Sequence, residues 1–244
     1  MRLPVISPSS LVLAVAVLGF GGAGLAQPAG DAPAPVPPVP AAAQGGEPEA
    51  APNGQRTFTL DAKKSSFVVQ VFKAGAASAL AHDHVVNATS LTGTVVVDSS
   101  SPSTAVVDVT VHTKGLVNDE PALRKRYGLD GEINEKDRAA ILDNMRNEAQ
   151  LDIKKFPTIR FVSTSVVPGA GTAMTLKGRL TIKGVTRDIA LPCEVSFAGS
   201  TVDGKGSIRL KTSDFGIEPY SAFLGAVRNQ DEIVLHVRFV AAAP

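Results

Sequence analysis

LTIKGVTRDIALP, residues 180–192, is the most informative stretch of this chain. Two runs in which apolar and polar residues alternate flank a tight Lys-Gly-Val-Thr corner at residues 183–186. Alternation with a period of two places successive side chains on opposite faces of a strand, so that each run can bury one face. The stretch therefore predicts a β-hairpin with one buried face.

Runs of the same kind recur through the rest of the chain. They lie at residues 57–61, 67–72, 91–98, 104–113, 159–167, 173–182, 188–197, 200–211 and 232–240. Turn-forming sequences separate several of them, such as Ser-Ser-Ser-Pro at 99–102 and Pro-Gly-Ala-Gly at 168–171. Eight or nine short strands that can pair as antiparallel neighbours predict a closed barrel or a sandwich.

Two segments together carry a resemblance to a known family. The hairpin stretch and the segment Phe156–Thr164 (FPTIRFVST), which leads into another alternating run, resemble the YceI-like family, and the resemblance extends from about Thr57 to Val240. It implies a secreted, mostly β protein with an antiparallel lipocalin-like β-barrel of about eight strands. It also implies that the barrel holds a long isoprenoid lipid, of polyprenyl or quinone type, for storage or transport.

One helical insert is predicted between the fourth and fifth runs. Asn134 can cap this helix, and Asp137 follows three residues later. An apolar stripe at helical spacing is expected to pack against one end of the barrel, and it consists of Ile141, Leu142, Met145 and Ala149. A second, shorter helix is expected over residues 219–227.

The first 26 residues have the pattern of a secretory signal peptide. Arg2 precedes an uncharged apolar run at 11–20, and small residues lead to an expected cleavage site after Ala26. The apolar core is about ten residues long, whereas a membrane-spanning helix needs about twenty. We therefore expect a periplasmic or secreted protein with no stable membrane span after cleavage of the signal.

Residues 27–55 are expected to be a disordered linker, and residues 56–242 to form one barrel domain. The linker holds eight of the chain's 17 prolines, together with many Ala and Gly residues, and cannot bury enough apolar surface to fold. Lys and Arg number 24 against 23 Asp and Glu, so loss of Arg2 with the signal leaves a balanced charge. A balanced chain gives no electrostatic reason to expect nucleic acid as a partner. The single cysteine, Cys193, is expected to be a buried structural thiol.

The sharpest polar feature is His82-Asp83-His84. In an extended segment both imidazoles point to the same side, as two ligands of a metal site would. Nothing in the sequence places a third ligand nearby, so no metal is assigned. The favoured interpretation is a hydrogen-bonded cluster at the barrel rim or a contact with a lipid head group. A metal-binding protein or an enzyme that uses this pair is the alternative.

No sequence pattern supports catalysis. The chain has no Gly-x-Ser-x-Gly elbow, phosphate-binding loop, Cys-x-x-Cys pair or dinucleotide fingerprint, and we predict that it is not an enzyme. Carboxylate pairs such as Asp119 and Glu120 lie in the hydrophilic insert, where a solvated surface is expected. No cofactor is expected other than a bound isoprenoid lipid.

Apolar residues at alternate strand positions are expected to line the barrel lumen: Val69, Val71, Val95, Val97, Val107, Val109, Phe161, Leu180, Ile182, Leu210 and Leu235. Many are valines, and a lumen of small side chains favours room for one slender ligand over a packed structural module without ligand. A polar head group would lie at the mouth, and its candidate contacts are His82, His84, Arg160, Lys183 and Arg187. The sequence does not identify the lipid, and a homodimer remains an open alternative.

Overall fold

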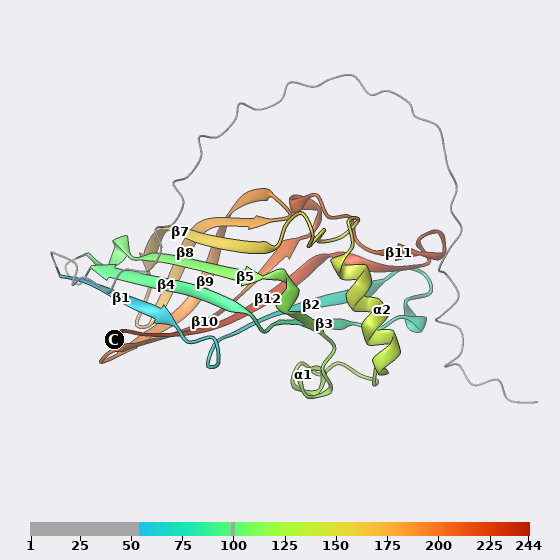
Figure 1. The fold of residues 1–244 in the computed structure, drawn as a ribbon, viewed down its shortest axis with the longest axis horizontal. Helices are drawn as coiled ribbons and strands as arrows, with labels where there is room; N and C mark the ends of the chain where they lie inside the picture. The colour runs from blue at the N-terminus through green and yellow to red at the C-terminus, as the bar shows by residue number, and fades with distance from the viewer. Residues whose placement is uncertain (1–53, 99–100) are drawn as a thin grey trace, which may run out of the picture. The chain divides into compact units, whose positions relative to one another are not determined.

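The structure is a computed structural model that describes residues 54–98 and 101–244 (Figure 1). The predicted signal peptide (1–26) and residues 27–53 of the predicted linker lie outside the described residues. The strands are β1 Gln55–Leu60, β2 Ser66–Ala74, β3 His84–Ala88, β4 Leu91–Asp98, β5 Val106–His112, β6 Leu116–Asn118, β7 Thr158–Pro168, β8 Ala173–Ile182, β9 Val185–Ala198, β10 Thr201–Lys211, β11 Ser221–Ala222 and β12 Val227–Ala242. The helices are α1 Pro121–Arg126 and α2 Glu135–Arg146.

Eight strands close into an antiparallel barrel in the order β1-β4-β5-β7-β8-β9-β10-β12. The closing contact joins β1 to the end of β12, where Thr59 pairs with Ala242 and Leu60 with Ala241. The longer first part of β12 pairs with β2. Strand β2 in turn pairs with β3, and β3 pairs with β6. The predicted antiparallel barrel of about eight strands is confirmed.

The informative stretch at residues 180–192 forms the β8–β9 hairpin. Ile182 pairs with Val185, which leaves Lys183 and Gly184 as a two-residue turn. Both turn residues have positive φ, 49° and 76°, as the tight turns that suit twisted hairpins require. The hairpin prediction is confirmed, and its turn fixes the register of the two strands.

Both helices lie in the segment between β6 and β7. Asn134 caps α2 as predicted, because its side-chain oxygen accepts a hydrogen bond of 2.9 Å from the backbone N–H of Asp137. Met145 is half-buried and packs against the core, whereas Ala149 is exposed and lies beyond the end of α2. The shorter helix α1, which begins at Pro121, was not predicted.

The prediction of a short helix over residues 219–227 is wrong. This segment contains β11, a 3-10 turn at Phe223–Gly225 and the first residue of β12. Phe223 and Leu224 have φ values of 51° and 56°, which lie in the left-handed region, and a right-handed helix cannot include them.

Alternate strand residues form the buried core in two clusters. The larger one includes Phe58, Val95, Val202 and Phe239, and the smaller one consists of Leu180, Phe215 and Ile217. The smaller cluster joins the β8–β9 hairpin to the turn that follows β10.

We expect Gly204→Ala to destabilise the protein. Gly204 faces Phe239 across the β10–β12 pair, and a Cβ atom on Gly204 would lie 2.1 Å from Cε1 of the Phe239 ring. Overpacking of this kind costs about 1–3 kcal/mol, measurable by urea denaturation. Adding Phe239→Leu should recover part of the loss, and a Gly204→Ala protein as stable as the parent would contradict this close contact.

Candidate functional site

Strands β9 and β10 are paired at one end and separated at the other. They pair only over residues 193–198 of β9 and 201–206 of β10. Pairing of β9 with β8 continues down to residue 185, and pairing of β10 with β12 continues up to residue 211. The ladder stops next to Pro192, which has no N–H to donate to a neighbouring strand. The barrel wall is therefore open beyond this proline.

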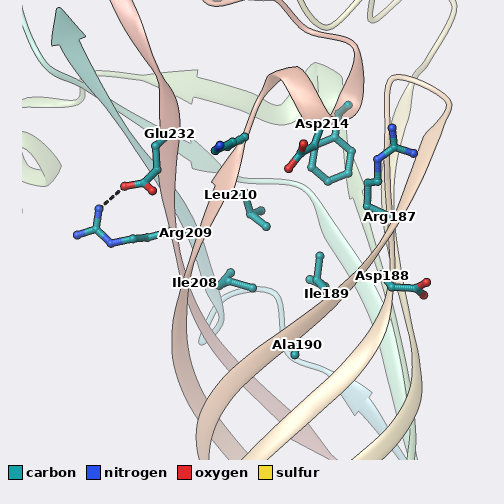
Figure 2. A pocket seen from close by; sticks show the side chains of 11 residues that line it. Arg187, Asp188, Ile189, Ala190, Ile208, Arg209, Leu210, Asp214 and Glu232 are labelled. Carbon is teal, nitrogen blue, oxygen red and sulfur yellow. Dashed lines mark hydrogen bonds and ion pairs between the residues drawn. The ribbon is translucent and has the colours of Figure 1, made fainter.

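A cavity of about 570 Å³ lies in this side opening, which we define as the gap between residues 185–192 of β9 and 207–211 of β10 (Figure 2). Ile189 and Ala190 line it from β9, and Ile208 and Leu210 from β10. Its charged lining residues are Arg187, Asp188, Arg209, Lys211, Asp214 and Glu232. The volume falls within the range of about 300–1,000 Å³ that is typical of small-molecule sites. The lining is mixed, with six charged and five apolar residues.

The apolar wall of the cavity continues into the barrel core. Phe215 lines the cavity and is buried together with Leu180 and Ile217. Ile189 and Leu210, which also line the cavity, pack against this buried cluster. The side opening therefore leads from solvent onto an apolar interior surface.

Asp231 holds the 3-10 turn Ser213–Phe215 that carries Phe215. Its carboxylate accepts hydrogen bonds from the Ser213 backbone N–H at 2.8 Å, the Ser213 hydroxyl at 2.6 Å and the Thr212 hydroxyl at 3.0 Å. The hydrogen bonds from Ser213 lower the pKa of Asp231, because they favour its ionised form. The turn is thus anchored by a carboxylate that is charged at neutral pH.

Arg187 places a cation at the cavity. It lies two residues before Ile189 on the same side of β9, and it faces the buried Leu180 across the β8–β9 pair. Its guanidinium donates a hydrogen bond of 3.1 Å to the carbonyl of Thr186. Within residues 54–98 and 101–244 it forms no ion pair, so its charge is available to a ligand.

The residues predicted to line the lumen differ in their burial. Those buried in the core clusters are Val95, Val107, Val109 and Leu180. Those half-buried and packed against the clusters are Val97, Phe161, Ile182, Leu210 and Leu235. Val69 and Val71 are half-buried on β2, where they pair with Leu235 and Ile233 of β12. Leu210 is the residue of this set that lines the cavity.

The residues predicted for the rim do not gather at one site. Arg187 lines the cavity, whereas Lys183 lies in the hairpin turn and donates to the carbonyl of Ala149 at 3.3 Å. Arg160 is exposed on β7 and forms two hydrogen bonds, of 3.0 and 2.5 Å, with the Asp108 carboxylate. His82 and His84 lie just before and at the start of β3 and do not line the cavity.

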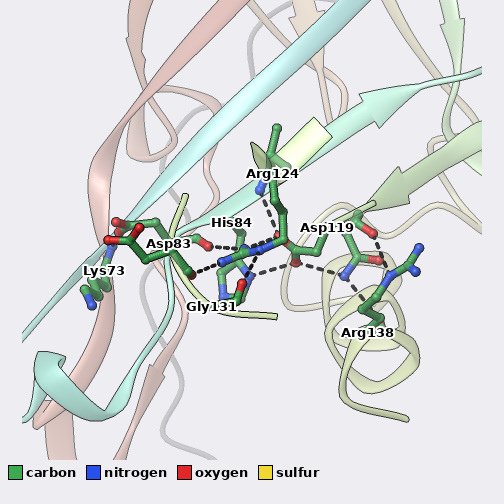
Figure 3. Close-up of polar contacts among 10 residues, drawn as sticks. Lys73, Asp83, His84, Asp119, Arg124, Gly131 and Arg138 are labelled. Atoms are coloured by element: carbon green, nitrogen blue, oxygen red, sulfur yellow. Dashed lines mark hydrogen bonds and ion pairs between the residues drawn. The ribbon is translucent and has the colours of Figure 1, made fainter. Parts of the chain in front are cut away.

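His84 belongs to a buried group that we call the Asp119 cluster, formed by His84, Asp119 and Arg124 (Figure 3). One carboxylate oxygen of Asp119 lies 2.8 Å from Nδ1 of His84, and the other accepts from Arg124 at 2.9 Å. The second oxygen also accepts from the backbone N–H of Val85 at 3.1 Å. The cluster therefore ties β3 to the helical insert.

Arg124 uses its remaining donors on backbone carbonyls. They bond to Asp83 at 2.7 Å, Asp130 at 2.6 Å and Gly131 at 3.1 Å. The guanidinium thus joins the segment before β3 to the loop that follows α1. This dense bonding supports a structural role for the Asp119 cluster, which includes His84 of the His82 and His84 pair.

The expectation that Asp119 is solvated is wrong, because this residue is only 1% exposed. Burial alone would raise the pKa of Asp119, but the hydrogen bond and charge of His84 outweigh it and hold this pKa below its usual range. Burial, assisted by the charge of Arg124, lowers the pKa of the neighbouring His82. No local sequence pattern signalled this cluster, because His84 lies 35 positions before Asp119 in the chain.

The described part of the chain holds no group of three or more His, Cys, Asp or Glu residues able to bind a metal ion. The pair His82 and His84 therefore finds no third protein ligand there. No helix within residues 54–98 and 101–244 is long and apolar enough to cross a membrane.

Comparison with the solved structure of BcnA supports the barrel fold. BcnA of Burkholderia cenocepacia superposes with a TM-score of 0.56 at 18% identity, over 74% of this chain and 98% of that protein. The YCEI protein of Campylobacter jejuni gives a TM-score of 0.48 at 18% identity, over 65% of this chain and 84% of that protein. At this level of identity the likeness to BcnA concerns the fold alone.

Sequence comparison identifies the family. UPF0312 proteins from three strains of Vibrio cholerae serotype O1 are 33% identical over 85 residues, which is 32% of this chain and 45% of those proteins. The chain thus matches less than half the length of these curated relatives. The model of the YceI-like domain matches residues 58–241, well over half of the chain. The protein therefore belongs to the YceI-like family.

Proposed function

We propose that the protein is a periplasmic or secreted carrier that binds a long isoprenoid lipid, of polyprenyl or quinone type, in its apolar interior. The observation that supports this most strongly is the cavity of about 570 Å³ in the side opening. Its apolar wall is continuous with the cluster of Leu180, Phe215 and Ile217. A slender hydrocarbon chain could lie along this surface without needing directed hydrogen bonds.

The free energy of burying methylene groups favours binding of a prenyl chain. Each buried methylene contributes about 0.8 kcal/mol, so three five-carbon units contribute about 12 kcal/mol before the costs of association and ordering. Those costs amount to about 4–15 kcal/mol. Several units in contact with protein are therefore needed for useful affinity, which favours a long chain over a short one.

Titration of the mature protein, freed of lipid, with a fluorescent geranylgeranyl probe tests this function. We expect saturable binding of one probe per protein, and competition by unlabelled polyprenyl lipid. Binding that does not saturate, or that linear alkanes and prenyl chains compete for equally, would contradict a specific isoprenoid site. A packed structural module would show no saturable signal.

Arg187 is expected to contact the head group. A phosphate at the cavity could form a charge-assisted hydrogen bond with this guanidinium, whereas an alcohol offers no charge. Because the site is open to water, we expect Arg187→Gln to weaken binding of a prenyl monophosphate by about tenfold and to leave binding of the corresponding alcohol nearly unchanged. Isothermal titration calorimetry measures both affinities.

Lys183→Gln is the matched control, because Lys183 lies close by in the hairpin turn but does not line the cavity. This variant should bind both ligands like the parent. Equal losses for phosphate and alcohol in Arg187→Gln would show that Arg187 supports the cavity wall and does not bind the head group.

A further inference from the structure

Two neighbouring loops hold three large apolar side chains in solvent. Leu80 is 63% exposed, Phe223 62% and Leu224 109%, and we call these three residues the apolar tip. Leu80 ends a 3-10 turn after β2, and the other two lie in the turn between β11 and β12. The loops are joined by a hydrogen bond of 2.8 Å from Ala77 N–H to the carbonyl of Ala226.

The backbone is strained at two of the three residues of the apolar tip. Phe223 and Leu224 have φ values of 51° and 56°, a conformation that costs residues other than glycine about 1–2 kcal/mol each. Exposure of both side chains, 62% for Phe223 and 109% for Leu224, adds an unfavourable contact with water. Glycine would avoid both costs, so stability alone does not explain why Phe223 and Leu224 occupy these positions.

The two loops that carry the apolar tip hold no acidic residue, and at their base the Asp83 carboxylate accepts a hydrogen bond of 2.7 Å from the backbone N–H of Lys73. Residues 74–81 carry no charge, and Arg228 is the sole charged residue between Glu218 and Asp231. At the base of the loops β2 and β12 place Lys73 and Arg228 on neighbouring strands. Apolar side chains with cations behind them fit the boundary between lipid head groups and acyl chains.

The apolar tip lies at the same end of the barrel as the side opening. β10 ends at Lys211 and β9 begins at Val185 beside the opening, and β12 begins at Val227 beside the tip. Figure 1 shows β11 and its turn at the end of the barrel opposite to the C-terminus. A surface held by the tip would therefore be close to the cavity.

We propose that the apolar tip inserts into the interfacial layer of a phospholipid bilayer and brings the side opening to the membrane from which the lipid enters. A bilayer fits better than a protein partner, because the fully exposed Leu224 projects and a protein would need a matching groove. The purpose assigned to this contact rests on the proposed lipid binding, but the contact can be measured without any cargo.

Co-sedimentation with vesicles tests this proposal. The full mature protein should bind dioleoylphosphatidylcholine vesicles and bind dioleoylphosphatidylglycerol vesicles more tightly, because Lys73 and Arg228 add attraction to an anionic surface. The double variant Phe223→Ser, Leu224→Ser should bind both at least about tenfold more weakly. Its thermal unfolding and its titration with the geranylgeranyl probe should match those of the parent.

Phe197→Ser is the matched control. Phe197 is 52% exposed, but it lies in the β9–β10 hairpin at the opposite end of the barrel. This variant should bind vesicles like the parent. A parent that does not bind either vesicle, or equal losses in both variants, would overturn the membrane contact. Vesicle binding through the apolar tip without probe binding would support the contact and overturn the proposed lipid cargo.

Discussion

Replacing Asp119 with alanine should lower the free energy of unfolding by about 3–5 kcal/mol. The substitution leaves the buried guanidinium of Arg124 without its carboxylate partner, at a contact that now measures 2.9 Å. It also removes the acceptor for His84 and for the backbone N–H of Val85. Urea denaturation followed by circular dichroism measures the change.

Glu120→Ala is the control, since this adjacent carboxylate is less buried and makes a single long hydrogen bond, of 3.4 Å, with Asn87. We expect this variant to lose no more than about 1 kcal/mol. If Asp119→Ala were as stable as Glu120→Ala, the buried cluster would not hold the insert against β3.

The same carboxylate predicts how stability changes in acid. The pKa of Asp119 in the folded protein lies below that of an unfolded aspartate, about 3.9. Its contribution is therefore fully present above about pH 4 and is lost as the pH falls through the lower, folded value. The difference in unfolding free energy between the parent and Asp119→Asn should thus be constant near neutral pH and shrink in acid. A constant difference down to the acid transition would contradict this account.

Ala190→Trp should strongly weaken binding of the prenyl probe. Ala190 lines the cavity from β9 and is exposed on the face opposite to Ile189, so the larger side chain can cover the outer edge of the side opening without disturbing the core. If it displaces about three methylenes of the lipid, the loss is about 2.4 kcal/mol, or about fifty-fold in the dissociation constant. Fluorescence titration against the parent gives this ratio.

Ala198→Trp provides the same substitution at the far end of the same strand, next to the β9–β10 turn and away from the cavity. It should bind the probe with the affinity of the parent. Equal affinity in Ala190→Trp would show that the lipid does not use the side opening.

Local pattern was enough to predict much of the fold. The alternation on both sides of Lys183 and Gly184 gave the β8–β9 hairpin, and the Asn134 cap gave the start of α2. These features depend on residues close in sequence, for which period and capping chemistry are informative. The turn at Phe223 and Leu224 was missed, because large apolar residues rarely adopt positive φ.

The candidate site was harder to predict, because it depends on pairing between distant segments. The alternation of residues 200–211 fitted a strand but did not show that β10 separates from β9 beyond Gly206. Pro192 was the residue that could have predicted this separation, since a proline inside a strand marks an edge or a break in pairing. The burial of Asp119 depends on Arg124 and on His84, 35 residues away, and its neighbours in sequence gave no sign of it.

The most direct test of lipid binding is to express the protein with its own N-terminal segment, purify it without detergent and analyse an organic extract by mass spectrometry. We predict about one prenyl lipid per protein molecule, and less in Ala190→Trp than in Ala198→Trp. An extract without prenyl lipid from a correctly folded protein, together with no uptake of added polyprenyl lipid, would contradict the carrier function.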